Sequence, residues 1–214
     1  MDPIKTQHQY HTALARVYEL MQLDSKENDA GSNELEVLSM LIKGYESKHY
    51  PVNTQPAIYW INQLNLQPHP EGGYYKETYR SGQNVSRAGS TTIKQACTSI
   101  YYLLADDDFS GFHRILSDEI WYFHKGVPLS IHVIDEGGIH TAHQLSDNAE
   151  GSLAIVVKAG QWFAADILLK QGFTLVSCAV APGFDFEEFE MAKKEELIAL
   201  YPHHTALISR LCRK

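Results

Sequence analysis

The chain has few cysteines, no clustered basic residues and no long apolar run. Cys97, Cys178 and Cys212 are odd in number and lack CxxC spacing, so reduced thiols are favoured over a disulfide framework or a zinc site. The net charge of -8 and the lack of Lys and Arg clusters argue against nucleic-acid binding, because phosphate contacts need such clusters. No apolar run approaches the roughly 18 residues of a membrane-spanning helix.

The start and the composition of the chain predict a cytoplasmic globular protein. The first residues, Met1-Asp2-Pro3, form neither a basic nor an apolar segment, so no signal peptide is visible. Hydrophobic residues make up 44% and charged residues 21%, which is ordinary for a soluble domain. The 214 residues allow one substantial domain and a small second unit.

The N-terminal part predicts a helical hairpin. Apolar residues recur at helical spacing in two segments, which are separated by the polar stretch 24–32. They are Tyr10, Leu14, Val17, Leu20 and Met21 in the first segment and Leu35, Leu38, Leu41, Ile42 and Tyr45 in the second. Pro56 is expected to begin a third, short helix. We therefore expect residues 1–55 to form a helical extension and residues 56–214 to form the main domain.

From residue 66 onward the pattern changes to short runs rich in Tyr, Thr, Val, Ile and Phe, separated by turn residues. Such runs without intervening helices are typical of an antiparallel sandwich or barrel. Residues 193–200 and 202–211 are again helical in pattern. The predicted strands are Tyr74–Arg80, Thr98–Leu104, Gly111–Leu116, Glu119–Gly126, Leu129–Ile134, His140–Leu145, Leu153–Val157, Trp162–Asp166 and Phe173–Val180.

Residues 109–126, FSGFHRILSDEIWYFHKG, hold the strongest candidate site. They indicate two apolar strands joined by a polar turn, with His113 on the first strand and Glu119 at the start of the second. On facing strands of a small barrel the two side chains point into one interior. A carboxylate–imidazole pair in such a space can bind a metal or move protons.

Six motifs carry a family resemblance: HPEGGYYKETYRS (69–81), TSIYYLL (98–104), FHRILSDEIWYFHKG (112–126), AGQWFAA (159–165), FTLVSCAVAPGFDFEEFE (173–190) and ELIALYP (196–202). Together they resemble the cupin superfamily, in a small-barrel branch known only as a domain of unknown function, over residues 61–213. The resemblance implies a mainly β fold, the cupin double-stranded β-helix or antiparallel jelly-roll barrel, here with the N-terminal hairpin and C-terminal helices. It also implies a homodimer and a small-molecule cavity, but no particular reaction.

A second resemblance concerns the N-terminal hairpin. The segment ELEVLSMLIKGYESKHYPV (34–52) is similar to the helical leader of bacterial helix-turn-helix antitoxins, over residues 10–60, but no helix-turn-helix follows. The hairpin is expected to pack on the main domain or on a dimer mate. The alternative is that residues 1–52 contact a protein partner.

The metal-binding pattern of cupins is incomplete in this chain. That pattern supplies three histidines and a glutamate. His113 and Glu119 occupy two of the four positions, but Ile115 and Phe163 replace the other two histidines. Neither replacement can coordinate, and a stable Zn, Fe or Mn site typically needs three or four protein ligands. We therefore expect no metal cofactor, and a metal-dependent cupin enzyme is the disfavoured alternative.

The remaining His113 and Glu119 can act as general base and general acid, as in the metal-free sugar-nucleotide epimerases that share the cupin fold. Burial raises the pKa of a carboxyl and lowers that of an imidazole, whereas pairing opposes both shifts. The first hypothesis is a metal-independent epimerase or isomerase acting on a sugar or nucleotide-sugar-like ligand. A non-catalytic metabolite-binding module, with a structural His–Glu hydrogen bond, is the alternative.

Five further residues are candidates for ligand binding: Arg80, Tyr101, Trp121, Gln161 and Phe163. Arg80 can hold an anion bidentately or form a salt bridge at the rim. Strand alternation predicts that it faces away from Tyr75 and Glu77. Tyr101 and Trp121 can stack on a planar ring or belong to the core. Gln161 and Phe163 lie in the later cupin motif.

Overall fold

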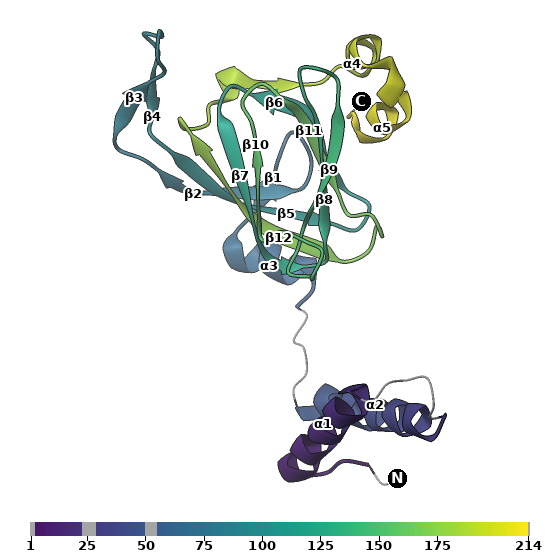
Figure 1. The fold of residues 1–214 in the computed structure, drawn as a ribbon. Coiled ribbons are helices and arrows are strands. Elements are labelled where there is room, and N and C mark those ends of the chain that lie inside the picture. Colours follow the sequence, from purple (N-terminus) through teal and green to yellow (C-terminus); the bar gives the residue numbers. More distant parts are fainter. Residues whose placement is uncertain (1–2, 23–28, 50–54, 214) are drawn as a thin grey trace. The chain divides into compact units, whose positions relative to one another are not determined.

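A computed structural model describes residues 3–22, 29–49 and 55–213 of the chain. These residues belong to two compact units, one within residues 1–54 and the other within residues 55–214 (Figure 1). The first unit is helical, whereas the second is built mainly from strands. None of the described helices is both long and apolar enough to cross a membrane.

The N-terminal unit consists of helices α1 (Gln7–Gln22) and α2 (Asp29–His49). Ala13 and Leu20 of α1 pack against Leu38 and Ile42 of α2. The predicted stripe of the first helix is therefore correct only in part, because its Leu14 and Met21 are exposed. Between the same helices Arg16 Nε lies 2.9 Å from Glu34 Oε1. The two helices therefore have a small core of their own.

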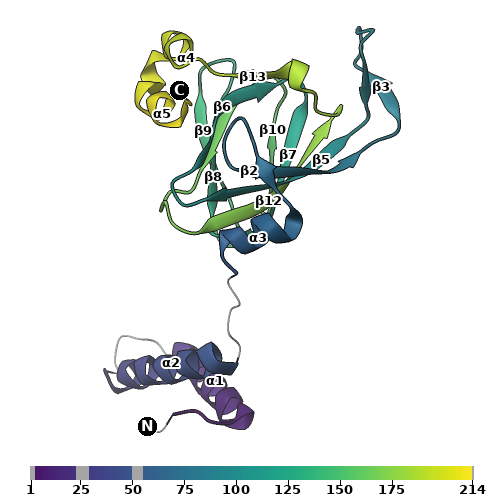
Figure 2. The same cartoon turned by 180° about the vertical axis from the view of Figure 1, so that it is seen from behind.

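The second unit is a barrel of two facing antiparallel sheets (Figures 1 and 2). The first sheet has the order β1 (Gln67–Pro68), β2 (Tyr74–Arg80), β5 (Thr98–Ala105), β12 (Phe173–Ala181), β7 (Asp118–Gly126) and β10 (Ala154–Val157). The second has the order β13 (Phe189–Met191), β6 (Phe109–Ile115), β11 (Trp162–Asp166), β8 (Leu129–Ile134) and β9 (His140–Leu145). A separate hairpin, β3 (Asn84–Ser86) and β4 (Ile93–Gln95), projects from the barrel in both views.

Helices cover two parts of the barrel. Helix α3 (Ala57–Leu64) packs on the outer side of the first sheet, where its Trp60 and Ile61 meet Leu103 of β5 and Leu175 of β12. The second sheet is covered by α4 (Lys194–Leu200) and α5 (Thr205–Leu211). Two 3-10 turns, η1 (Phe186–Glu188) and η2 (Pro202–His204), precede β13 and α5.

The barrel core lies between the two sheets and consists of alternate residues from their strands. Tyr102, Trp121, Leu129, Ile131 and Phe163 belong to this cluster, and each is almost fully buried. Burial of one such side chain contributes about 1.5–3 kcal/mol. The core therefore holds the strands that frame the interior in a fixed register.

Every predicted strand is present, with ends within two residues of those expected. The short strands β1, β3, β4 and β13 were not predicted, because two or three residues are too few to show a period. The predicted orientation of Arg80 was wrong. Glu77 pairs with Ile100 and Tyr79 with Ser99, so Thr78 is an extra residue in a β-bulge. The bulge reverses the alternation and turns Arg80 to the side of Glu77.

Candidate functional site

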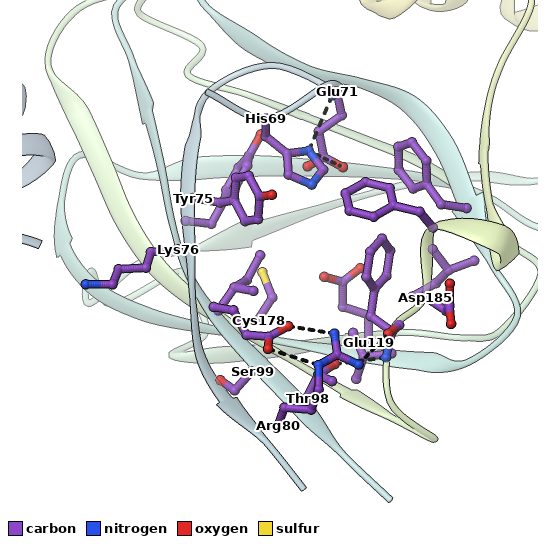
Figure 3. A pocket seen from close by; sticks show the side chains of 18 of the residues that line it. His69, Glu71, Tyr75, Lys76, Arg80, Thr98, Ser99, Glu119, Cys178 and Asp185 are labelled. Atoms are coloured by element: carbon purple, nitrogen blue, oxygen red, sulfur yellow. Dashed lines mark hydrogen bonds and ion pairs between the residues drawn. The ribbon is translucent and has the colours of Figure 1, made fainter. Parts of the chain in front are cut away.

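The barrel contains a pocket of about 370 Å³, lined by strands of both sheets (Figure 3). The loop before β2 and the segment around η1 complete its wall. In Figure 3 His69 and Glu71 lie at one end, Arg80 lies at the other, and Lys76 extends away from the interior. The lining residues are Gln67, His69, Glu71, Tyr75, Lys76, Glu77, Arg80, Thr98, Ser99, Ile100, Tyr102, His113, Ile115, Glu119, Cys178, Val180, Phe184, Asp185, Phe186 and Phe189.

The central polar contact of the pocket joins His113 of β6 to Glu71. His113 Nε2 lies 3.2 Å from Glu71 Oε2, and both side chains are buried. On its other side, His113 Nδ1 lies 2.8 Å from the carbonyl oxygen of Gly111. Since a carbonyl can only accept, Nδ1 carries a proton and donates it there. The other ring nitrogen, Nε2, therefore faces the Glu71 carboxylate across an ion-pair contact.

Glu71 is held in place by the turn that carries it. Ser110 Oγ donates to Glu71 Oε1 at 3.0 Å. Gly72 and Gly73 follow with φ values of +115° and +67°, a region that disfavours other residues. The sequence motif HPEGG was used only for the family resemblance, and Glu71 was not predicted as a site residue. The available signal was a glutamate directly before two glycines, within a motif already assigned to the family.

His69 is a neutral imidazole beside this pair. Its Nδ1 accepts a 3.3 Å hydrogen bond from the backbone N–H of Glu71. Burial lowers the pKa of His69, and this effect exceeds the opposing attraction of the Glu71 carboxylate. Its ring meets Tyr75 edge-on, with centroids 4.5 Å apart. His69 therefore has a proton on Nε2 and can act as a hydrogen-bond donor in the pocket.

Glu119 of β7 has a different environment from Glu71. Its side chain is buried, and desolvation, reinforced by the negative charge of Glu71, raises its pKa to about 8. Cys178 also lines this part of the pocket, and burial likewise raises the pKa of its thiol. Glu119 is therefore mainly a neutral carboxylic acid at neutral pH. The pocket thus contains a proton donor separate from the His113–Glu71 pair.

The structure brings three of the sequence-predicted residues to the pocket: His113, Glu119 and Arg80. The expected partner of His113 was Glu119, but the carboxylate that it contacts is Glu71. The guanidinium of Arg80 is already bound to Glu77, with contacts of 3.0 and 2.6 Å. This arrangement is the salt bridge at the rim rather than a free anion clamp.

The other four predicted residues lie elsewhere. Tyr101 packs on the α3 side of the first sheet, and Trp121 belongs to the core, with its ring centroid 5.5 Å from that of Tyr102. Gln161 Oε1 accepts from the backbone N–H of Lys158 in the turn before β11. Phe163 pairs across strands with His113 and packs on its ring, at a centroid distance of 4.0 Å. Phe163 therefore restricts the position of the His113 ring by packing against it.

The residues do not fit a cupin metal centre. Ile115 lines the pocket and Phe163 covers the His113 ring, both at positions where the metal-binding pattern has histidine. His113 Nε2 faces Glu71. Among residues 3–22, 29–49 and 55–213, no group of three or more His, Cys, Asp or Glu side chains is arranged to hold a metal ion.

Comparisons with known proteins agree with this fold. The uncharacterized protein YML079W of Saccharomyces cerevisiae is 33% identical over 151 residues, which are 64% of this chain and 75% of the yeast protein. The structure of a hypothetical protein from Leishmania major is similar with a TM-score of 0.69 at 36% identity, covering 75% of this chain and 100% of that one. Protein SO0799 from Shewanella oneidensis gives a TM-score of 0.68 at 39% identity, covering 74% and 98%.

The family match covers most of the barrel. Residues 58–192 match the family described as "Cupin superfamily (DUF985)", and this confirms the resemblance drawn from the six motifs. It also confirms a cupin β-barrel with helical flanks, a fold that binds small molecules. This chain therefore belongs to the DUF985 family of the cupin superfamily.

Proposed function

We propose that this protein is a metal-independent epimerase or isomerase acting on a sugar or nucleotide-sugar-like ligand. The observation that carries the proposal is the presence of two different acid–base groups in one pocket. His113 lies against the Glu71 carboxylate, whereas Glu119 keeps a proton at neutral pH because burial raises its pKa to about 8. Groups whose environments push their proton affinities apart are suited to opposite roles in proton transfer.

The proposed reaction moves a proton next to a carbonyl group. The C–H bond of the substrate breaks, its proton goes to Nε2 of His113, and the electron pair moves onto the carbonyl oxygen. Glu71 stabilises the imidazolium that forms, and Glu119 supplies the proton that completes the product. The aromatic side chains of Tyr75 and Phe186 limit access of water and offer faces for a sugar or base ring.

Proton exchange tests this proposal. Candidate sugars and nucleotide sugars are incubated with the protein in heavy water, and deuterium uptake at carbon is read by NMR. We expect exchange that falls by about 10²–10⁴-fold in His113→Ala and in Glu119→Gln, the usual contribution of a general acid or base. His124→Ala is the matched control, since His124 contacts Ser177 and Tyr101 on the other side of the first sheet. Unchanged turnover of the identified substrate in His113→Ala would exclude the mechanism.

A non-catalytic binding module is the second candidate, and the N-terminal unit favours it. Leu14, Tyr18 and Met21 of α1 recur at helical spacing and are exposed, so they form an apolar stripe that can contact a protein partner. In that case the barrel holds a metabolite and the hairpin contacts the partner. The resemblance of residues 10–60 to antitoxin leaders stays a prediction.

Substitutions on this stripe separate the two candidates. Tyr18→Glu with Met21→Glu is expected to abolish partner capture and to leave metabolite affinity in the barrel unchanged. Exposed Glu36→Gln on α2 is the control. Capture by the double variant at the wild-type level would count against the binding module.

A further inference from the structure

Arg213, in the segment after α5, lies against the loop that carries Glu71. Its Nε donates to the backbone carbonyl of Glu71 at 2.8 Å. Its Nη2 contacts the carboxylate of Asp108 and the carbonyl of Phe109. The guanidinium also lies over the Phe109 ring, 4.3 Å from its centroid. One side chain thus joins the loop before β2 to the start of β6.

The backbone around Arg213 is shaped to receive it. A Cβ added to Gly72 would lie 1.7 Å from Arg213 Nη2, and a Cβ added to Gly111 would lie 2.7 Å from Arg213 Cγ. At these two positions any larger residue would displace the arginine. The absence of side chains on Gly72 and Gly111 therefore creates the space that Arg213 fills.

The contacts of Arg213 lead to both members of the catalytic pair. The carbonyl of Glu71 accepts from Arg213 and also from the backbone N–H of Gly111, at 2.8 Å. The carbonyl of Gly111 in turn accepts from His113 Nδ1, the bond that sets the histidine tautomer. On the other side, the Asp108 carboxylate accepts from the backbone N–H of Gly73 at 2.8 Å. Arg213 thus connects to the backbone on both sides of the Glu71–His113 contact.

We propose that Arg213 is a positioning residue, which holds the loop 69–73 against β6 so that the Glu71 carboxylate stays in contact with His113. Its significance for catalysis rests on the proposed function, but the geometric role does not. Lysine cannot replace it fully, because a single ammonium lacks the planar fork that reaches the Glu71 carbonyl, the Phe109 carbonyl and the Asp108 carboxylate together.

NMR on the full-length protein tests this role without a substrate. Two direct reporters are the exchange of the Gly111 and Gly73 amide protons with solvent. A third is the chemical shift of the His113 ring signals, which Glu71→Gln calibrates by removing the neighbouring carboxylate. In Arg213→Gln we expect both amides to exchange at least about tenfold faster, since the hydrogen bonds lost involve a charged group. The His113 ring signals should move towards their positions in Glu71→Gln.

Arg210→Gln is the matched control. Arg210 lies on α5 and pairs with a different barrel carboxylate, Asp166, which is outside the pocket lining. This variant should leave all three reporters unchanged.

Arg213→Lys should give an intermediate result, and this variant alone provides the test if Arg213→Gln does not fold. Wild-type exchange rates and a wild-type ring signal in a folded Arg213 variant would overturn the proposal. Absence of turnover with normal reporters would count against the proposed function instead.

Discussion

At the scale of single residues, the two buried carboxyl groups of the pocket, Glu71 and Glu119, differ because their neighbours differ. Glu71 accepts a hydrogen bond from Ser110 and contacts His113, so polar groups surround its carboxylate. Glu119 is desolvated next to Cys178, and the charge of Glu71 disfavours a second anion in the same pocket. One side-chain type therefore supplies two roles, a partner for the histidine ring and a neutral acid.

The protonation of Glu119 predicts a pH-dependent stability. Its pKa is about 8 in the folded protein, above the ordinary 4.5, so folded molecules keep a proton that unfolded chains lose. The free energy of unfolding therefore has a contribution that is fully present below pH 4.5 and is lost as pH rises towards 8. Glu119→Gln removes this contribution. Its stability relative to wild type should increase with pH, as measured by urea unfolding across this range.

Asp118→Asn is the control for this measurement. The adjacent Asp118 is partly exposed and bonded to Lys158, a contact that lowers its pKa. Its substitution should therefore cost stability, and by a small amount because the group is exposed. Parallel stability curves of wild type and Glu119→Gln would show that Glu119 is ionised in the folded protein.

At the scale of elements, a histidine cluster joins the C-terminal helices to the second sheet. His132 of β8 contacts His140 of β9 through ring nitrogens 3.1 Å apart, and its other nitrogen lies 3.1 Å from Asp166 of β11. His204 of η2 lies beside His140, at a centroid distance of 5.6 Å, and contacts the carbonyl of Gly138 at 2.8 Å. Arg210 of α5 pairs with Asp166. Hydrogen bonding between two imidazoles requires one unprotonated nitrogen.

Acidification is therefore expected to loosen α4 and α5. Burial lowers the pKa of His140 below the ordinary 6.5, and the neighbouring His132 and His204 lower it further. The stabilising contribution of neutral His140 is present above pH 6.5 and is lost as pH falls through its folded value. Amide exchange in α4 and α5, corrected for its intrinsic pH dependence, should speed up below pH 6.5 in wild type.

Two substitutions sharpen this experiment. In His140→Gln the acceleration should be much weaker, because the titrating group is gone. In the control His203→Gln it should persist, because His203 is exposed on the same turn. Exchange in α4 and α5 that follows only the intrinsic pH dependence would contradict the expectation.

At the scale of the whole molecule, the barrel leaves strand edges that a second copy can cover. The first sheet ends at β1 and β10, and the second ends at β13 and β9. Of these, β9 is six residues long and has mostly partly or fully exposed side chains. An open edge presents unpaired N–H and C=O groups and favours pairing with another chain. The edge strands are therefore candidates for the interface of a homodimer.

We expect a homodimer in solution. Light scattering at micromolar concentration should give twice the chain mass of 24.2 kDa, and native mass spectrometry should report the same state together with any retained metabolite. A proline substitution at Thr141 in β9, which weakens edge pairing, should shift the equilibrium towards monomer if β9 forms the interface. A monomer for the wild-type protein under these conditions would contradict the prediction.

Local signals were sufficient for most of the barrel and for part of the site. The strand from Leu129 to Ile134 was predicted without error because its length and its β-branched residues are local properties. His113 was singled out because it lies in a motif with fixed spacing. Arg80 shows the limit of this reasoning. The bulge at Thr78 depends on the register with β5, which no run of residues in β2 reveals.

The sequence by itself determined the fold class, the family and the loss of two metal-ligand positions, since each depends on residue types at known separations. Only the tertiary structure decided which groups meet. Glu71 lies on the loop before β2 and contacts His113 of β6, which is distant in the sequence. Tyr101 packs on the outer side of the first sheet, and Arg213 donates a hydrogen bond to the loop that carries Glu71. These contacts depend on strand register and on side-chain packing between distant segments. Local hydrophobic periodicity predicts neither of these properties.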